Sequence, residues 1–507
     1  VYFGGYIRYE GDILRGDDLP SFIKDENTFL QKLSELMGEF VYIQETGRRI
    51  LAVVDRKRSI PLYIYKAGEN VLVTDHMKDI ASTALHKTAV REFILTGYTT
   101  RHKTLYPQVQ QLEAGTYAQI SDAGEIDANE YYQYYHHPEE RELEDFAGEL
   151  KDVFYSVFQD VLARLKNKTA VIPLSGGYDS RIIALMLKEF GMDNIVAFTY
   201  GKKDNAEARV SKSMADRLGL DWKFVEYRRE DWKKWSESDE WKEYVQFAAN
   251  GTSVAHIQDF PATKEIVREH PGDLVFVPGH SGDFVAGSHL PYEITLDKPY
   301  TKDEVVQFIL DKHFRLWELR GGIRTNAPDV VREIEASFGE LPYENKEEAS
   351  ALFEYWDWRE RQAKFIINSL RVYEFYEKSW DIPLWDDRFM EFFKKVPVKW
   401  RYKKYLYDYT LHKMFPDYFP KPTGEMSPSL KQKYGRLYPL AKKLYNKMRI
   451  LSQYHKDPKG WFGICGDYGN YLKQLSFMYD HHIFKQPSNI TSFLAKDYIL
   501  SINRKKK

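Results

Sequence analysis

The chain of 507 residues contains a single cysteine, Cys465. One cysteine excludes an intramolecular disulfide and any metal site built from several thiolates, and this usage is typical of a cytoplasmic enzyme. No apolar run reaches the roughly 18 to 20 residues that span a bilayer. The N-terminal segment also lacks the basic and then apolar pattern of a secretory signal. We therefore expect a cytoplasmic protein with no membrane partner.

The sequence has no excess of charge of either sign. Its formal net charge is −2, and its 43% hydrophobic and 29% charged residues are the proportions of a soluble globular protein. Because no basic excess is present to attract phosphate backbones, we expect no nucleic-acid partner. The length is too great for one typical domain and predicts two or three.

The first part of the chain, residues 1–138, predicts a β-rich domain. Its short segments alternate apolar and polar residues between turn signals, a pattern typical of hairpins. The predicted strands are Phe40–Ile43, Ile50–Val54, Pro61–Tyr65, Val71–Thr74 and Thr116–Ile120. The acidic and polar segment 136–148 predicts a linker and the start of a helix.

The second part, residues 149–507, predicts an α/β domain. Helical periods alternate with short apolar runs, and a βαβα order favours a doubly wound parallel sheet. After about residue 300 the pattern is nearly all helical. The predicted elements are strands Ala170–Leu174, Ile195–Thr199, Trp222–Val225 and Leu274–Val277, and helices Arg181–Phe190 and Asn205–Leu218.

The most informative segment is Ser175–Ser180, which reads SGGYDS between a predicted strand and a predicted helix. Gly176 and Gly177 allow backbone N–H groups to approach a phosphate, and the hydroxyls of Ser175 and Ser180 add donors. The helix dipole also favours negative charge at this point. Because the carboxylate of Asp179 would repel bare phosphate, its presence indicates a bridging Mg²⁺.

The loop has no Gly-Lys-Ser/Thr after its glycines and is not a Walker A sequence. It resembles the SGGxDS loop of the N-type ATP pyrophosphatases. The resemblance implies that ATP is cleaved between its α and β phosphates, that a substrate is adenylated and that pyrophosphate is released. Members that transfer sulfur to tRNA generally need catalytic or cluster-binding cysteines. With Cys465 alone, sulfur transfer is not expected.

Nearly the whole chain resembles the asparagine synthetase B family, which includes β-lactam synthetase and the asparagine synthetase-like proteins of polysaccharide and peptide biosynthesis. Phe29–Ile80 and Gly97–Tyr117 resemble its N-terminal glutaminase domain. The resemblance implies an N-terminal nucleophile (Ntn) hydrolase fold, a β-sandwich with helices. The family nucleophile is a first-residue cysteine, whereas Val1 stands first here. We therefore expect a glutaminase-like domain that is catalytically silent, since no thiolate can form a thioester.

The second part resembles the family's synthetase domain. Ile195–Thr199 corresponds to the strand whose backbone pairs with adenine, which makes Thr199 a nucleotide-binding residue. Val277–Ser288 (VPGHSGDFVAGS) is similar to SGEGSDEVFGGY, which adds Gly279 to the nucleotide site. The same similarity implies that Asp283 holds Mg²⁺ together with Asp179. After PLWD at Pro383–Asp386, which resembles PFLD, Lys404 corresponds to the lysine that neutralises charge during amide formation and fits better than Lys403.

Three departures from the family pattern bear on the substrate. His280 and Ser379 stand where asparagine synthetases have glutamates, and Phe284 replaces the acid that follows Asp283. The loss of these carboxylates argues against free aspartate as the activated acid. His280 is a candidate catalytic base or substrate ligand. Gly251–Phe260 is expected to line the acyl pocket, with these candidates: Ser253, His256 and Asp259.

These observations predict an ATP- and Mg²⁺-dependent ligase that adenylates a carboxylate and transfers the acyl group to ammonia or an amine. The acid is expected to be a small molecule or a sugar acid. Asparagine synthetase proper is one alternative, and a nucleotide-binding pseudoenzyme or interaction protein is another. A homodimer stays an open alternative.

Overall fold

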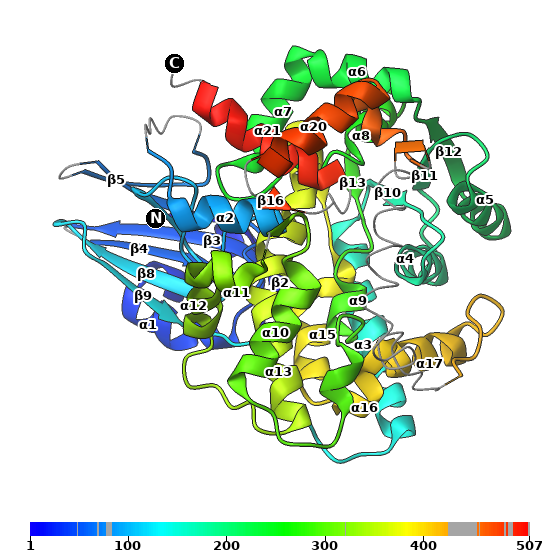
Figure 1. Cartoon of the computed structure of the whole chain (residues 1–507). Coiled ribbons are helices and arrows are strands. Elements are labelled where there is room, and N and C mark those ends of the chain that lie inside the picture. The colour runs from blue at the N-terminus through cyan, green and yellow to red at the C-terminus, as the bar shows by residue number, and fades with distance from the viewer. Residues whose placement is uncertain are drawn as a thin grey trace.

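The computed structural model describes residues 1–47, 49–67, 70–77, 84–319, 321–423, 454–455, 457–480, 483–484 and 490–504. Antiparallel sheets from the start of the chain lie on one side of the molecule, and a parallel sheet among helices lies on the other (Figure 1). The expected mixed α/β class is therefore observed. In the described part of the chain, no helix has both the length and the apolar composition required to cross a bilayer.

Two antiparallel sheets form the first part. The larger has the strand order β2-β1-β3-β4-β8-β9 and the smaller the order β6-β5-β7. Apolar side chains of β3, β4 and β8 pack with Leu62 and Ile64 in one core cluster, so the small sheet covers one face of the large one. The strands are β1 Tyr2–Tyr9, β2 Asp12–Leu14, β3 Met37–Thr46, β4 Arg49–Val54, β5 Tyr63–Ala67, β6 Asn70–Thr74, β7 Val109–Gln111, β8 Thr116–Ser121 and β9 Ile126–Glu130.

The other face of the large sheet is covered by helix α1, Glu26–Lys32, where Phe29 packs among strand residues such as Phe40 and Tyr42. Helix α2, Lys87–Thr96, packs against the C-terminal helix: the ring of Phe93 stacks on the ring of Tyr498, with 5.6 Å between the centroids. α2 therefore shares its core with residues that follow position 149.

The parallel sheet has the strand order β12-β11-β10-β13-β15. Taken in chain order this is 3-2-1-4-5, a doubly wound arrangement whose direction of winding reverses between β10 and β13. In such sheets ligands bind at the carboxyl ends of the strands beside that reversal. The strands are β10 Thr169–Pro173, β11 Ile195–Gly201, β12 Asp221–Glu226, β13 Leu274–Phe276 and β15 Ser379–Trp380.

Helices surround this sheet and form most of the chain after residue 300, as the sequence predicts. The short strands β14 Glu318–Leu319 and β16 Ile483–Phe484 pair with each other. The helices are α3 Leu143–Arg164, α4 Tyr178–Glu189, α5 Ala206–Leu218, α6 Arg229–Glu237, α7 Asp239–Ala249, α8 Phe260–Glu269, α9 Gly282–Val285, α10 Lys302–His313, α11 Ile323–Asn326, α12 Pro328–Ser337, α13 Lys346–Trp356, α14 Arg371–Phe375, α15 Asp387–Lys394, α16 Val398–Arg401, α17 Tyr405–Met414, α20 Tyr468–Asp480 and α21 Ile490–Arg504.

Two features differ from the sequence expectations. The segment expected as a linker is packed: His136 is buried, and the N–H groups of His137 and Glu139 donate to carbonyls at the end of α15. The second feature is a π-helix at Asp357–Ile366 directly after α13. π-helical turns are rare and often occur at functional sites.

A buried ion pair fixes the chain before Lys404. Arg401 is fully buried, pairs with Glu354, and donates to the Ser350 hydroxyl at 2.9 Å and to the Val396 carbonyl at 2.8 Å. The Arg401 carbonyl oxygen packs closely against Gly287: a Cβ on Gly287 would be 2.6 Å from this oxygen. The turn that carries Lys404 is thus held against the segment that follows Asp283.

We expect Arg401→Met to lower the free energy of unfolding by about 3 to 5 kcal/mol. The buried Glu354 carboxylate would lose its cationic partner and keep only the His136 ring, 3.0 Å away, whose pKa burial lowers. Urea unfolding followed by circular dichroism measures the loss. Arg268→Met is the matched control, since Arg268 forms only exposed pairs with Glu265 and Glu269, and it should change stability by less than about 0.5 kcal/mol. Equal stability of the two variants would contradict the stabilising role of the buried pair between Arg401 and Glu354.

Candidate active site

The Ser175–Ser180 loop joins β10 to α4 and lies at the carboxyl end of a central strand. The helix begins at Tyr178, three residues before the amphipathic pattern that predicts it, so Asp179 and Ser180 belong to its first turn. The Ser180 hydroxyl accepts from the Ser175 N–H at 3.0 Å, and the Ser175 hydroxyl accepts from the Gly177 N–H at 3.1 Å. The loop is therefore closed on itself around the exposed N–H groups of a helix start.

The space above the two loop glycines is open. A Cβ on Gly177 would meet only the Ser175 hydroxyl, at 3.2 Å, and one on Gly176 would meet Val210 at an ordinary 3.6 Å. A side chain at Gly177 would occupy this open space beside the loop. This is the room that a phosphate group needs if backbone N–H donors are to reach it.

Gly279 brings a second loop against the first. It follows β13, and a Cβ at this position would lie 2.8 Å from the Ser180 nitrogen and 2.9 Å from the Asp179 Cβ. Such separations are not tolerated between a side chain and a fixed backbone, so only glycine fits here. The two loops flank the point between β10 and β13 where the sheet reverses its winding.

A cavity of about 210 Å³ opens between these loops. It contains six of the residues that the sequence singled out for nucleotide binding or catalysis, which are Ser175, Gly177, Asp179, Ser180, Gly279 and His280. Three residues of the expected acyl-pocket segment Gly251–Phe260 lie on its wall as well, which are His256, Gln258 and Asp259. The structure thus gathers residues from positions 175 to 280 at one end of the sheet.

Asp179 and Asp283 form an acidic pair beside this cavity. Burial raises the pKa of Asp179 to about 6; the Lys404 ammonium opposes this effect and the Asp283 carboxylate adds to it. Two neighbouring carboxylates, one of which raises the pKa of the other, are a donor set that would suit a divalent cation. Among the described residues, no group of three or more His, Cys, Asp or Glu side chains gathers as a separate metal site.

Asp283 is kept ionised by its neighbours. Burial works against ionisation, but the hydrogen bond and charge of His289 outweigh it and hold the pKa of Asp283 well below its usual range. The Ser288 hydroxyl also donates to this carboxylate at 3.2 Å. On its other side the His289 ring contacts the buried Asp357, whose charge raises the pKa of His289 against the effect of burial. The π-helix therefore supports the acidic pair through a histidine.

Lys404 lies against the loop. Its Nζ is 4.0 Å from Asp179 Oδ1 and 3.7 Å from Asp408 Oδ1, and it stands over the ring of Tyr178 at 5.4 Å from the centroid. Lys403 instead is exposed and contacts the ring of Tyr402. Both lysines have left-handed backbones, with φ of 56° and 60°, a strained conformation for non-glycine residues that occurs preferentially at functional sites.

His280 lines the cavity and accepts from or donates to the Ser369 hydroxyl at 2.8 Å. Burial lowers the pKa of His280, and burial followed by the charge of His280 lowers that of His256 to about 3. Both rings are therefore neutral near pH 7. Asp259 accepts hydrogen bonds from the hydroxyls of Tyr200 and Tyr373, which orient it at the cavity wall.

Other sequence candidates lie away from the cavity. The Thr199 hydroxyl is buried between the Leu174 carbonyl and Ser211, so only its backbone can meet a nucleotide. Ser253 is buried and does not line the cavity, and Phe284 is a core residue. Ser379 lies at a second cavity, described below.

Sequence reasoning missed several residues at this site. The Tyr407 hydroxyl donates to Asp179 at 3.1 Å, and Tyr200 and Ser369 line the cavity. Tyr407 stands in one of the aromatic clusters that the sequence contains, but it is 228 positions from its partner, and no local motif marks it. The only available signal for Tyr407 is its closeness to Lys404.

Comparison with known proteins bears on this region directly. Residues 159–254 match the family model described as asparagine synthase. No curated relative matches the chain. Among solved structures, the allosteric regulatory enzyme of purine biosynthesis is similar at 13% identity over 54% of this chain and 68% of its own, with a TM-score of 0.19. Glutamine phosphoribosylpyrophosphate amidotransferase from B. subtilis, complexed with ADP and GMP, is similar at 12% identity over 55% and 61%, with a TM-score of 0.18.

The two structural likenesses are too weak to carry an argument about fold or function. The family match is different, because it contains β10, the Ser175–Ser180 loop, α4 and β11. The segment that builds the phosphate side of the cavity is therefore asparagine synthase-like, and members of that family are ATP-using ligases.

Proposed function

We propose that the chain is an ATP-dependent, AMP-forming amide ligase. The observation that carries the proposal is the cavity lined by the phosphate loop and Asp179, with Asp283 and Lys404 next to Asp179 at its side. Residues 149–507 would form the synthetase domain. Residues 1–138 would form a glutaminase-like scaffold, because the chain's one cysteine is buried and burial raises the pKa of the Cys465 thiol to about 12.

In the first step, a substrate carboxylate oxygen attacks the α-phosphorus of ATP; a new P–O bond forms and the bond to pyrophosphate breaks. Helix-start N–H groups and the hydroxyls of Ser175 and Ser180 would hold the phosphates. A bound Mg²⁺ supplies charge neutralisation for the departing pyrophosphate, and Asp179 and Asp283 are the residues that would hold it. Lys404 adds a fixed positive charge from the other side.

In the second step, a nitrogen nucleophile attacks the acyl carbon, the bond to AMP breaks and the nitrogen loses a proton. His280 is a neutral imidazole on the cavity wall and is the candidate to accept that proton. His256 also lies on the wall, but with its pKa lowered to about 3 it is a much weaker base. The Ser369 hydroxyl is hydrogen-bonded to the His280 ring and orients it. Among the described residues, His256 Nε2 has no hydrogen-bond partner. The nitrogen is ammonia or an amine.

The cavity wall favours an acid other than free aspartate. His280 occupies the position where aspartate-using enzymes would need a carboxylate for the ammonium group, and Ser379 lies outside the cavity. Apart from Asp179, the acid on this cavity wall is Asp259, and its carboxylate already accepts hydrogen bonds from two tyrosine hydroxyls. A hydroxylated small molecule or sugar acid suits this mixture of hydroxyl, imidazole and carboxylate groups.

Isotope exchange between pyrophosphate and ATP tests the first step. With Mg²⁺ and a panel of small carboxylic and uronic acids, we expect one class of acid to stimulate exchange. Asp179→Asn should reduce that exchange by about 100-fold or more, because one of the two carboxylates that would hold Mg²⁺ against the departing pyrophosphate is lost. Asp193→Asn is the control. Asp193 is an exposed residue that follows the same helix, and its one ion pair among the described residues is with Lys188.

A result in which ATP binds but no acid supports exchange, and Asp179→Asn binds ATP as the unaltered chain does, would favour the nucleotide-binding pseudoenzyme instead. Exchange stimulated by L-aspartate alone would favour asparagine synthetase proper.

A further inference from the structure

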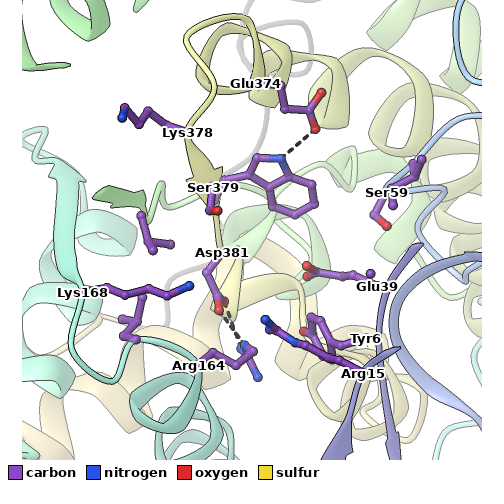
Figure 2. Close-up of a pocket in the computed structure, with 15 residues that line it drawn as sticks. Tyr6, Arg15, Glu39, Ser59, Arg164, Lys168, Glu374, Lys378, Ser379 and Asp381 are labelled. Carbon is purple, nitrogen blue, oxygen red and sulfur yellow. Dashed lines mark hydrogen bonds and ion pairs between the residues drawn. The ribbon is translucent and has the colours of Figure 1, made fainter. Parts of the chain in front are cut away.

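A second cavity, of about 340 Å³, lies between the large antiparallel sheet and the parallel sheet (Figure 2). Tyr6 of β1 and Glu39 of β3 form one side. Lys168, which directly precedes β10, and Trp380 of β15 form the other. Because Lys168 stands at the amino end of β10 and the nucleotide loop at its carboxyl end, the two cavities lie at opposite edges of the sheet. They share no lining residue.

The wall of this cavity has more positive than negative charge. Its basic side chains are Arg15, Arg164, Lys168 and Lys378, and its acidic ones are Glu39, Glu374 and Asp381. Two of the acids already have cationic partners. Asp381 accepts from Arg164 at 2.6 and 3.0 Å, and Glu374 lies 2.7 Å from Arg371 and also accepts from the Trp380 indole nitrogen. Neither carboxylate is therefore left to balance the other basic groups.

The third acid, Glu39, adds little negative charge. It is buried, and its Oε1 is 3.7 Å from Lys57 Nζ. Burial raises the pKa of Glu39 to about 8, although the Lys57 ammonium lowers it, so the carboxyl is largely protonated at pH 7. A protonated Glu39 is neutral, and an ionised one is balanced by Lys57. In both forms the excess on the wall stays positive.

Three cations of the wall have no close carboxylate partner. Among the described residues, no ion pair involves Arg15 or Lys378, and Lys168 Nζ is 3.9 Å from the exposed Asp273. Figure 2 shows the Arg15 and Lys168 side chains extending inward from opposite walls, whereas the Lys378 ammonium points outward. Arg15 and Lys168 are therefore the charges that a ligand inside the cavity would meet.

Arg15 is also held near a second guanidinium. The Arg15 and Arg164 groups lie over the same Tyr6 ring, 5.2 and 5.0 Å from its centroid. Asp381 is hydrogen-bonded to Arg164 and forms no ion pair with Arg15 in the described structure. Two like charges close together with one carboxylate between them repel each other, and an anion beside Arg15 would offset that repulsion.

The rest of the wall is largely apolar. The indole of Trp380 is fixed through its nitrogen, and its neighbours on the wall are Ile60, Leu165 and Val275. An apolar group placed here would leave water and contact these side chains, which favours binding. A ligand that uses the whole cavity must therefore carry an apolar part as well as negative charge.

We propose that this cavity binds a small organic phosphate. The phosphate group would lie between Arg15 and Lys168, and the organic part would pack against Trp380. A dianionic phosphate balances both unpartnered cations, whereas a single carboxylate balances one, and a cationic ligand would be repelled. The proposal is independent of the ligase activity, because the cavity shares no residue with the nucleotide site.

Calorimetric titration of the full chain with phenyl phosphate, at pH 7 and without nucleotide, tests the proposal. The second pKa of such a phosphate is about 6, so the dianion predominates. We expect saturable binding with a Kd of about 1 mM or tighter. Inorganic phosphate lacks the ring and benzoate lacks the second charge, and each should bind at least about tenfold more weakly. No binding by phenyl phosphate at about 10 mM, or equal binding by either comparison compound, would overturn the proposal.

Two variants test whether the ligand binds in this cavity. Arg15→Met and Lys168→Met should each weaken phenyl phosphate binding at least about tenfold, because each removes a charged hydrogen-bond donor. Neither side chain is buried, so both variants should fold. Lys166→Met is the matched control: Lys166 is exposed, lies two positions before Lys168 and does not line the cavity. Its affinity should stay within about twofold at physiological salt, which screens distant charges.

A further variant separates this cavity from the nucleotide loop, which also attracts phosphates. Gly279→Ala alters the phosphate side of the nucleotide cavity and leaves the second cavity untouched, so it should bind phenyl phosphate as the unaltered chain does. Loss of binding in Gly279→Ala, or unchanged binding in both Arg15→Met and Lys168→Met, would refute the assignment.

Discussion

Lys404→Ala is expected to reduce acid-stimulated exchange between pyrophosphate and ATP by about 100- to 1,000-fold, with little change in stability. Lys404 is the cation that lies nearest to Asp179 among the described residues, with 4.0 Å between Nζ and Oδ1. Removing a preorganised charge from a site where negative charge develops typically costs about 2.7 to 4 kcal/mol of barrier. The rate of exchange at saturating ATP and acid is the measurement.

Lys403→Ala is the matched control for this prediction. The two lysines are adjacent and both have left-handed backbones with φ near 60°, so the strain is already present and alanine leaves it similar at either position. Only the side chains differ, because Lys403 is exposed and contacts the ring of Tyr402. We expect its exchange rate to stay within about twofold of the unaltered chain. Equal losses of exchange rate in both variants would mean that the exchange depends on the conformation of the turn and not on the Lys404 charge.

The local part of this site was accessible from the sequence. An apolar run, two glycines and an amphipathic segment predict strand, loop and helix, and β10 and α4 lie within three residues of the predicted bounds. The parallel sheet follows from the same alternation of strands and helices. Backbone chemistry at a helix start depends on neighbours in sequence, so such a motif can be read without knowledge of the fold.

The supporting residues could not be predicted this way. Tyr407 reaches Asp179 across 228 positions, and Ser369 reaches His280 across 89. The π-helix at Asp357–Ile366 follows a helical pattern in the sequence, and nothing in that pattern distinguishes a π-turn from an α-turn. These contacts arise from tertiary packing, which decides the orientation of His289 and hence the charge state of Asp283.

A contact between Gly38 and Asp387 joins the first part of the chain to the second. Asp387, directly after the PLWD segment, accepts from the Gly38 N–H at 2.7 Å and lies 3.5 Å from Lys57. Leu384 in the same segment packs where a side chain on Gly282 would stand, next to Asp283. One short segment, residues 383–387, thus contacts both the antiparallel sheet and the loop that carries Asp283, and no local motif in the sequence predicts these contacts.

Gly279→Ala is expected to abolish productive ATP binding while leaving most of the fold intact. The added Cβ would lie 2.8 Å from the Ser180 nitrogen and 2.9 Å from the Asp179 Cβ, so the loop after β13 must move away from the start of α4. Both opposing atoms are held by backbone and helix, and overpacking of this kind costs about 1 to 3 kcal/mol. We expect the exchange rate to fall by about 100-fold and the apparent affinity for Mg²⁺·ATP to fall with it, since both depend on the spacing of the two loops.

Gly148→Ala separates this effect from the general cost of substituting glycine. Gly148 lies within α3, and a Cβ there would meet nothing within 4 Å. Alanine should therefore stabilise the chain by about 1 kcal/mol, because it is the better helix former, and leave exchange unchanged. Nucleotide titration and urea unfolding of both variants give the comparison. Unaltered ATP affinity in Gly279→Ala would show that the two loops do not jointly form the phosphate site.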